Sequence, residues 1–201
     1  SASPWPSATI GGGLRAWYRA DLGVIKDSSN RVSQWTDLSG TGAHVTQTVT
    51  ASQQPVWIAS ALNGQPALQF SGATSLATTG PVDIHAGNPD QTVIAVLAPS
   101  ATQSNWSTIL DLRSGPSQGF AWQQNGAQIN QFKMWWMGNP PAGWQGSPGA
   151  TAVAGVGVQV LSSVKSGSSA ADFLNGVAQG TSVVPANSLI PSAALAVGNA
   201  I

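Results

Sequence analysis

The chain has 201 residues, enough for one sizeable domain, and 7% of them are charged, against about a quarter in a typical protein. Its seven acidic residues are all aspartates, and seven lysines and arginines balance them. This composition excludes the basic footprint of a protein that binds nucleic acid or an anionic membrane. It also excludes disulfides, thiolate metal sites and a membrane span of about 18 apolar residues.

Short apolar or alternating runs between turn residues predict an all-β fold, without repeats or a long amphipathic helix. Residues 1–13 are rich in proline and glycine and predict an arm or linker. The expected strands are Leu14–Arg19, Val32–Thr36, Ala67–Phe70, Gln91–Leu97, Ser107–Leu112, Gly119–Gln123, Gln131–Met137, Gly157–Val164 and Ala171–Leu174. The continuous apolar run of Gln91–Leu97 predicts a buried central strand. Asn125-Gly126 and Asn175-Gly176 predict hairpin turns, because both residue types tolerate positive φ.

Alternation along Gln131–Met137 separates its side chains onto two faces. One face is wholly apolar and is expected in the core; it holds Phe132, Met134 and Trp136. The other face is expected to meet solvent or a groove; it holds Gln131, Lys133, Trp135 and Met137. In Gly119–Gln123 the same alternation places Phe120 and Trp122 in the core, opposite Ala121 and Gln123.

Trp135 is therefore a large ring on a polar face, and Trp106 and Trp144 lie in predicted loops. Loop indoles of this kind either cap one end of the fold or join Trp135 in an aromatic platform. An indole suits the CH face of a pyranose ring, and the uncharged polar neighbours suit the hydroxyls of a neutral glycan. The candidate ligand-binding residues are Trp135, Trp144, Trp106, Lys133 and Gln145.

The segments LRAWYRAD (14–21), RVSQWTDLSGTGAHVTQ (31–47), QPVW (54–57) and LNGQPALQFSG (62–72) resemble the bacterial laminin-G-like domains. The matching positions are Trp17, Trp35, Asp37, Ser39, Gly40, Gly42, Pro55, Asn63, Gly64, Pro66, Phe70 and Gly72. DFLNGVAQGT (172–181) is similar to a hairpin of that family, with Phe173 in place of tyrosine.

This resemblance implies a jelly-roll β-sandwich of the concanavalin-A-like superfamily over residues 14–201. The structural core is then expected to contain Trp17, Trp35, Phe70, Phe120, Trp122, Trp136 and Phe173. Such domains also imply a secreted bacterial surface protein or a bacteriophage virion. The relatives continue beyond Asn199 with a strand that pairs near the first one. We therefore expect either a longer polypeptide or a neighbouring subunit to supply that partner for Leu14–Arg19.

Asp37 follows Trp35 in a W-x-D-x-S-G turn. Its carboxylate is expected to accept hydrogen bonds from the following backbone amides, while Gly40 and Gly42 take positive φ. The alternative is a calcium ligand, although no D-x-D-x-D-G loop is present. No other cofactor is expected.

Little in the sequence indicates catalysis. Glucanases of this superfamily use a pair of glutamates, and the chain has none; no two aspartates lie two positions apart. Gly115–Gly119 matches the G-x-S-x-G string, but a strand follows it where a nucleophile elbow needs a helix. His44 and His85 are expected to be hydrogen-bonded surface residues.

The sequence therefore favours a non-catalytic carbohydrate- or cell-surface-binding module of a larger extracellular or phage protein. A structural or assembly module, which contacts neighbouring subunits, is the alternative. A polysaccharide-degrading enzyme is the third reading. Neither a nucleic-acid partner nor membrane insertion is expected.

Overall fold

A computed structural model of the chain describes residues 10–83, 90–101, 103–113, 119–137, 143–152, 156–186 and 193–198. Its elements are strands and two 3-10 turns, η1 (Gly11–Gly13) and η2 (Ala51–Gln53), which confirms the all-β prediction. Within these ranges, no helix is long and apolar enough to cross a membrane. Residues 1–9 of the predicted arm lie outside the description.

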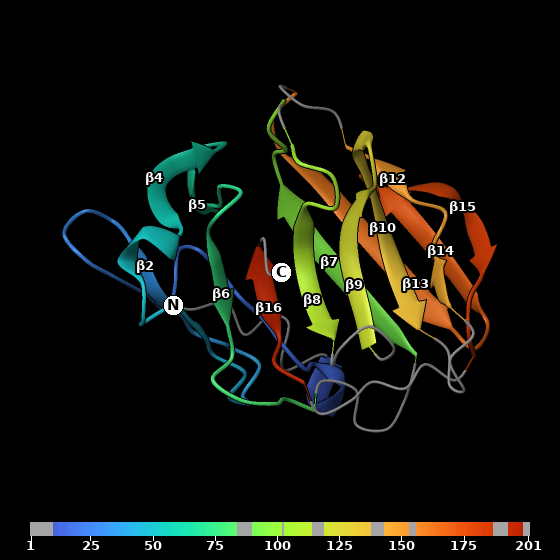
Figure 1. Cartoon of the computed structure of the whole chain (residues 1–201), viewed down its shortest axis with the longest axis horizontal. Helices are drawn as coiled ribbons and strands as arrows, with labels where there is room; N and C mark the ends of the chain where they lie inside the picture. The colour runs from blue at the N-terminus through green and yellow to red at the C-terminus, as the bar shows by residue number, and fades with distance from the viewer. Residues whose placement is uncertain are drawn as a thin grey trace.

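The strands form three antiparallel sheets (Figure 1). The larger sheet has the order β1 (Val24–Lys26), β2 (Val32–Trp35), β3 (Val45–Thr46), β6 (Ser75–Ala77), β16 (Ala196–Gly198), β8 (Thr108–Arg113), β9 (Gly119–Asn125), β10 (Gln128–Met137) and β11 (Trp144–Gly146), and β12 (Ala150–Thr151) also pairs with β10. The smaller sheet has the order β15 (Val177–Val183), β14 (Ser169–Leu174), β13 (Gln159–Ser166) and β7 (Gln91–Leu97). A separate ribbon consists of β4 (Val56–Leu62) and β5 (Gln65–Gln69).

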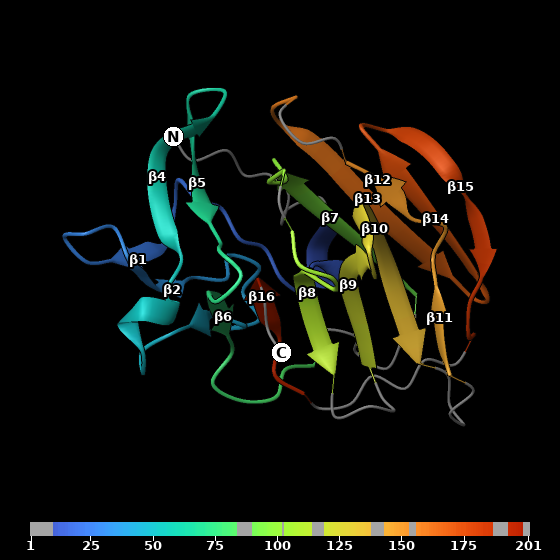
Figure 2. The ribbon, with the colours of Figure 1, turned by 45° about the horizontal axis from the view of Figure 1, so that its top comes forward.

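The two main sheets pack face to face, with β7 and β13 behind β8, β9 and β10 (Figures 1 and 2). Between them lie Phe120, Trp122 and Trp136, each at most 1% exposed. Leu161 and Ala170 contribute to the same cluster from the smaller sheet. The alternation of β9 and β10 therefore predicts their core faces correctly, and the fold is a β-sandwich.

The opposite face of β9 and β10 is less open to solvent than predicted. Met137 is 5% exposed, Ala121 1% and Gln123 8%. Met137 pairs with the large Trp144 of β11, and Ala121 lies in register between Asp111 and Trp135. Small or flexible side chains between larger neighbours lose most of their exposure, so this part of the sheet is covered on both sides.

Four of the predicted core residues are only partly buried. Trp35 and Phe70 are partly buried and pack against the core cluster. A Cβ at Gly198 would lie 2.4 Å from the Phe70 ring, so the ring packs directly on the backbone of β16. Trp17 and Phe173 lie outside the cluster, and their placement in the core was wrong. Phe173 faces outward because its neighbour Asp172, 1% exposed, takes the interior side of β14.

Leu14–Arg19 is not a strand, contrary to prediction; Arg19 makes only an isolated bridge, to Leu22. Side chains hold this segment instead. The indole Nε1 of Trp35 donates to the Arg19 carbonyl at 2.7 Å, and that of Trp57 donates to the Ala20 carbonyl at 2.8 Å. The edge that was expected to need a partner strand is therefore absent here.

The strand Gln91–Leu97 has the predicted bounds as β7 but not the predicted position. It lies at one end of the smaller sheet, and its outward side chains Ile94 and Val96 are 64% and 60% exposed. An apolar run identifies a strand but does not reveal how many of its sides are covered.

The turn predictions were partly correct. Asn175 and Gly176 have φ values of 50° and 80° between β14 and β15, as a two-residue hairpin turn requires. Between β9 and β10 the turn lies one residue later than predicted, because Asn125 already pairs with Gln128. Gly119 begins β9, so a strand does follow the G-x-S-x-G string; residues 115–118 lie outside the description.

The interior of the smaller sheet contains polar groups that the sequence did not predict. Lys165 is 1% exposed, and its Nζ donates to the carbonyls of Gly167 at 2.8 Å and Ala186 at 3.4 Å. Burial lowers the pKa of Lys165, while the carboxylate of Asp90 acts in the opposite direction. The lysine is therefore held by neutral carbonyls in a place that disfavours its charge.

Candidate functional site

Trp106 has an unusual backbone conformation, with φ at 63°. This left-handed region costs an ordinary residue about 1–2 kcal/mol, and a bulky side chain there is a genuine outlier. Yet Trp106 is 50% exposed, so only half of its ring gains from packing. Strain of this kind persists only where the surroundings enforce it, and it is concentrated at functional sites.

A network of hydrogen bonds enforces the turn that carries Trp106. The Ser107 amide donates to the Ser104 carbonyl at 3.1 Å, and the Ser107 hydroxyl donates to the same carbonyl at 2.7 Å. Gln124 of β9, fully buried, donates its Nε2 to this carbonyl as well, at 3.2 Å. The loop is thus fixed to the sheet, and the exposed ring is presented in one place.

The Trp135 ring packs against the Trp106 ring. The ring centroids are 6.1 Å apart with the planes at 61°, an edge-to-face contact. A Cβ on Gly146 of β11 would lie 3.0 Å from the Trp135 ring, so this ring rests directly on the backbone of β11. The Nζ of Lys133 lies 5.7 Å from the Trp135 centroid. Trp135 is accordingly half-buried among these neighbours, and Trp106 is the more exposed ring.

The register between β10 and β11 decides on which side of the sheet Trp144 and Gln145, the other two predicted ligand-binding residues, lie. Trp144 pairs with Met137 and so lies on the same side of the sheet as Trp135. Gln145 pairs with Trp136, whose side chain is fully buried in the core. Gln145 therefore belongs to the interior side, and its inclusion among the ligand-binding candidates was wrong.

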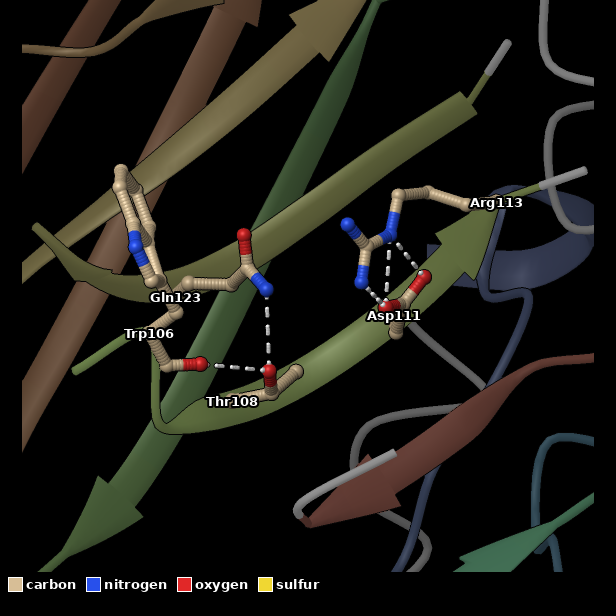
Figure 3. Close-up of polar contacts among 5 residues, drawn as sticks. All are labelled: Trp106, Thr108, Asp111, Arg113 and Gln123. Atoms are coloured by element: carbon tan, nitrogen blue, oxygen red, sulfur yellow. Dashed lines mark hydrogen bonds and ion pairs between the residues drawn. The ribbon is translucent and has the colours of Figure 1, made fainter. Parts of the chain in front are cut away.

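Next to Trp106 lies a row of polar side chains that the sequence did not indicate (Figure 3). Gln123 donates its Nε2 to the Thr108 hydroxyl at 3.1 Å. Farther along β8, the Arg113 Nε donates to both Asp111 carboxylate oxygens, at 2.9 and 2.8 Å. The Asp111 side chain is 8% exposed and that of Arg113 is 29% exposed, so the guanidinium covers the carboxylate. The two charges balance each other locally.

We call this surface the Trp106 face; it comprises Trp106, Thr108, Asp111, Arg113, Gln123, Lys133, Trp135 and Trp144. The structure brings together four of the five predicted ligand-binding residues and adds four polar ones. Alternation along Thr108–Arg113 opposes Asp111 to the buried Leu112, which was the available signal. Chemically, the face combines a broad apolar ring with donors and acceptors whose charges are largely paired.

The turn at Asp37 forms a separate, structural centre. Its Oδ1 accepts from the amides of Trp17 at 2.9 Å and Ser39 at 3.0 Å. Its Oδ2 accepts from the hydroxyls of Ser39 at 2.7 Å and Thr41 at 3.0 Å, and from the Ala43 amide at 3.2 Å. Burial alone would raise the pKa of Asp37, but these hydrogen bonds outweigh burial and hold the pKa below its ordinary value.

These contacts give Asp37 the structural role that the turn pattern predicts, and Gly40 and Gly42 have φ of 93° and 81°. His44 is a hydrogen-bonded surface residue, since its Nδ1 accepts from the Asp37 amide at 3.0 Å. In the part of the chain that is described, no three His, Cys, Asp or Glu side chains gather as a metal site would require. His85 lies outside the described residues.

No family model matches the chain, and no curated protein matches it. Solved structures do. A GH54 α-L-arabinofuranosidase soaked with a cyclic sulfate inhibitor has a TM-score of 0.59 at 15% identity, over 85% of this chain and 44% of that one. An arabinofuranosidase complexed with arabinofuranosyl-α-1,2-xylobiose has a TM-score of 0.54 at 14% identity, over 83% and 43%.

The binding domain of Paraclostridial Mosquitocidal Protein 1 has a TM-score of 0.61 at 7% identity, over 89% of this chain and 45% of that one. At such identities the similarity establishes the fold alone, an all-β sandwich. The chain spans less than half of the length of each of these proteins. The resemblance to laminin-G-like domains stays a prediction, because no family model matches.

Proposed function

We propose that the chain is a non-catalytic module that binds carbohydrate through the Trp106 face. The observation that carries this proposal is Trp106 itself. Its half-exposed indole is held at a backbone φ of 63°, in edge-to-face contact with a second indole. The half of the ring that packs against Trp135 and Gly126 helps to offset the strain, and the other half faces solvent. Strained, exposed positions of this kind are concentrated at functional sites, and the free half of the ring is available to stack on a ligand.

The polar part of the face suits hydroxyl groups. Of its side chains, the Arg113 guanidinium reaches solvent and can donate hydrogen bonds to a ligand, whereas Asp111 and Gln123 are at most 8% exposed. Because the Asp111 and Arg113 charges are paired, a sugar without charge meets no uncompensated group at this position. The zero net charge of the chain agrees with a neutral glycan or surface polymer as the ligand.

Binding is favoured over cleavage by the carboxylates available. Glycoside hydrolysis by the usual route needs two carboxylates that flank the scissile bond. Among the described residues of β8 to β11, Asp111 is the one carboxylate, and Arg113 occupies both of its oxygens. The similar structures include arabinofuranosidases as well as a toxin's binding domain, so a polysaccharide-degrading enzyme is the alternative to test.

The proposal also concerns the larger protein to which this domain belongs. Since the similar solved chains are more than twice as long as the part matched here, we place this domain in a larger extracellular or phage protein. Its role there is adhesion to a cell-surface glycan. The laminin-G-like segments support the same setting.

A glycan array followed by calorimetry tests the proposal. The wild-type chain should bind at least one neutral glycan, and Trp106→Asn should weaken that binding at least tenfold. The matched control is Trp17→Phe, which changes an indole outside the Trp106 face and should leave the affinity unchanged. Silence on the array, or affinity that survives Trp106→Asn, would refute the proposal. Release of reducing sugar from the bound glycan would favour the enzyme instead.

A further inference from the structure

Strand β7 pairs along only one of its edges with another described strand. It pairs with β13 from Gln91 to Leu97, and no ladder among the described residues pairs its other edge. The strand is seven residues long and contains no charge, no proline and no register shift. Natural sheets protect such edges with lysine, proline or bulges, and β7 has none of these.

The burial along β7 shows that its edge is incompletely covered. Its interior-facing residues Val93, Ala95 and Leu97 are only partly buried. Their ladder partners on β13 are far more enclosed: Ser163 is 1% exposed, Leu161 0% and Gln159 3%. On the outward side, Ile94 and Val96 are more than half exposed. Apolar groups therefore meet solvent on both sides of this one strand.

The opposite edge of the same sheet, formed by β15, is irregular. The ladder between β14 and β15 shifts register between Asp172 and Phe173, opposite Gly180, whose φ is 126°. An irregularity of this kind twists an edge away from regular pairing. Among the strands that the structure describes, this sheet thus has one edge with a bulge and one that is regular and unpaired.

We propose that the β7 edge is an interface between two copies of this chain. Two β7 strands related by a twofold axis near Ile94 run antiparallel, so each copy offers the other the same unpaired amides and carbonyls. In this pairing Ile94 meets Ile94 of the second copy, and Thr92 meets Val96. The strand carries no charge, so no like charges oppose each other. The two smaller sheets then join into one continuous sheet.

The size of this contact sets its strength. Seven residues and a few apolar side chains bury less than the roughly 1,200 Å² that stable complexes exceed. The dimer is therefore expected to dissociate on dilution. If the Trp106 face binds glycan as proposed above, the dimer carries two such faces and gains avidity on a repetitive surface.

Sedimentation velocity and light scattering over a concentration series test the interface. The chain should shift reversibly from 20.4 kDa towards twice that mass as its concentration rises. Ile94→Lys should keep it monomeric at every concentration, and Val96→Glu should do the same. Both side chains point to solvent, so the fold should survive either change, which circular dichroism checks.

The matched control is Val183→Lys on β15, a valine 80% exposed at the opposite edge of the same sheet; it should leave dimerisation unchanged. A wild-type chain that is monomeric throughout would overturn the proposal. So would a dimer that persists in Ile94→Lys and Val96→Glu, or one that Val183→Lys removes as well.

Discussion

Replacing Trp106 with asparagine distinguishes the contributions of backbone strain and of ring packing to the free energy of unfolding. Asparagine adopts the left-handed region more readily than most residues, so the substitution should recover much of the about 1–2 kcal/mol of backbone strain. Against this gain stands the buried half of the ring. An indole buries about 200 Å² in a core, so half of it at about 25 cal/mol per Å² contributes roughly 2.5 kcal/mol. The net loss of stability should be about 1 kcal/mol.

Urea unfolding monitored by the remaining tryptophans measures this difference, and thermal unfolding should show a fall of only about 2–4 °C. Asn105→Ala, in the same turn but without the ring, is the control. The same Trp106→Asn protein should lose glycan affinity, so stability and binding would be affected very differently. A loss of more than about 3 kcal/mol, the range of a fully buried aromatic residue, would show that Trp106 is a structural ring.

Three further outcomes are expected. Trp136→Ala should destabilise the chain by about 3–5 kcal/mol in urea unfolding, and Trp135→Ala by clearly less, because only Trp136 is fully buried. The pKa of Asp37 lies below its ordinary value, so its carboxylate stabilises the fold above about pH 4, and this contribution falls as the pH drops further. The urea midpoint should therefore decrease below about pH 4 in the wild type, and Asp37→Asn should make this decrease smaller. Burial lowers the pKa of Lys165, so this lysine loses its proton at a lower pH in the folded chain than in the unfolded chain, and the free energy of unfolding should rise as the pH approaches about 10.4. Lys165→Met should abolish that rise in the same assay.

The faces of β9 and β10 were predictable because alternation is a property of the strand alone. Phe120, Trp122 and Trp136 are buried wherever these strands lie in the sheet, provided that one face meets a core. The turn at Asp37 was predictable for a similar reason. Its donors Ser39, Thr41 and Ala43 follow within six residues, so local chain geometry brings most of them to the carboxylate.

The position of β7 was not predictable in this way. The run Gln91–Leu97 has the composition of a central strand, yet the described strands pair with only one side of it. Pairing depends on which distant segment arrives beside a strand, and no local pattern encodes that. Phe173 fails for the same reason, since the interior side of β14 is taken by Asp172, which hydrogen-bonds to the Gly149 amide at 2.7 Å.

The sequence by itself thus determined most of the longer strands, one hairpin turn and the side on which most aromatic rings lie, because these depend on residues within a few positions of one another. Only the tertiary structure decided that Trp106 is strained and exposed in contact with Trp135, with Asp111 and Arg113 nearby on β8. It also decided that β7 lies at one end of the smaller sheet as far as the chain is described. Both results depend on register between segments that are far apart in the chain, where backbone hydrogen bonds fix which side chains become neighbours.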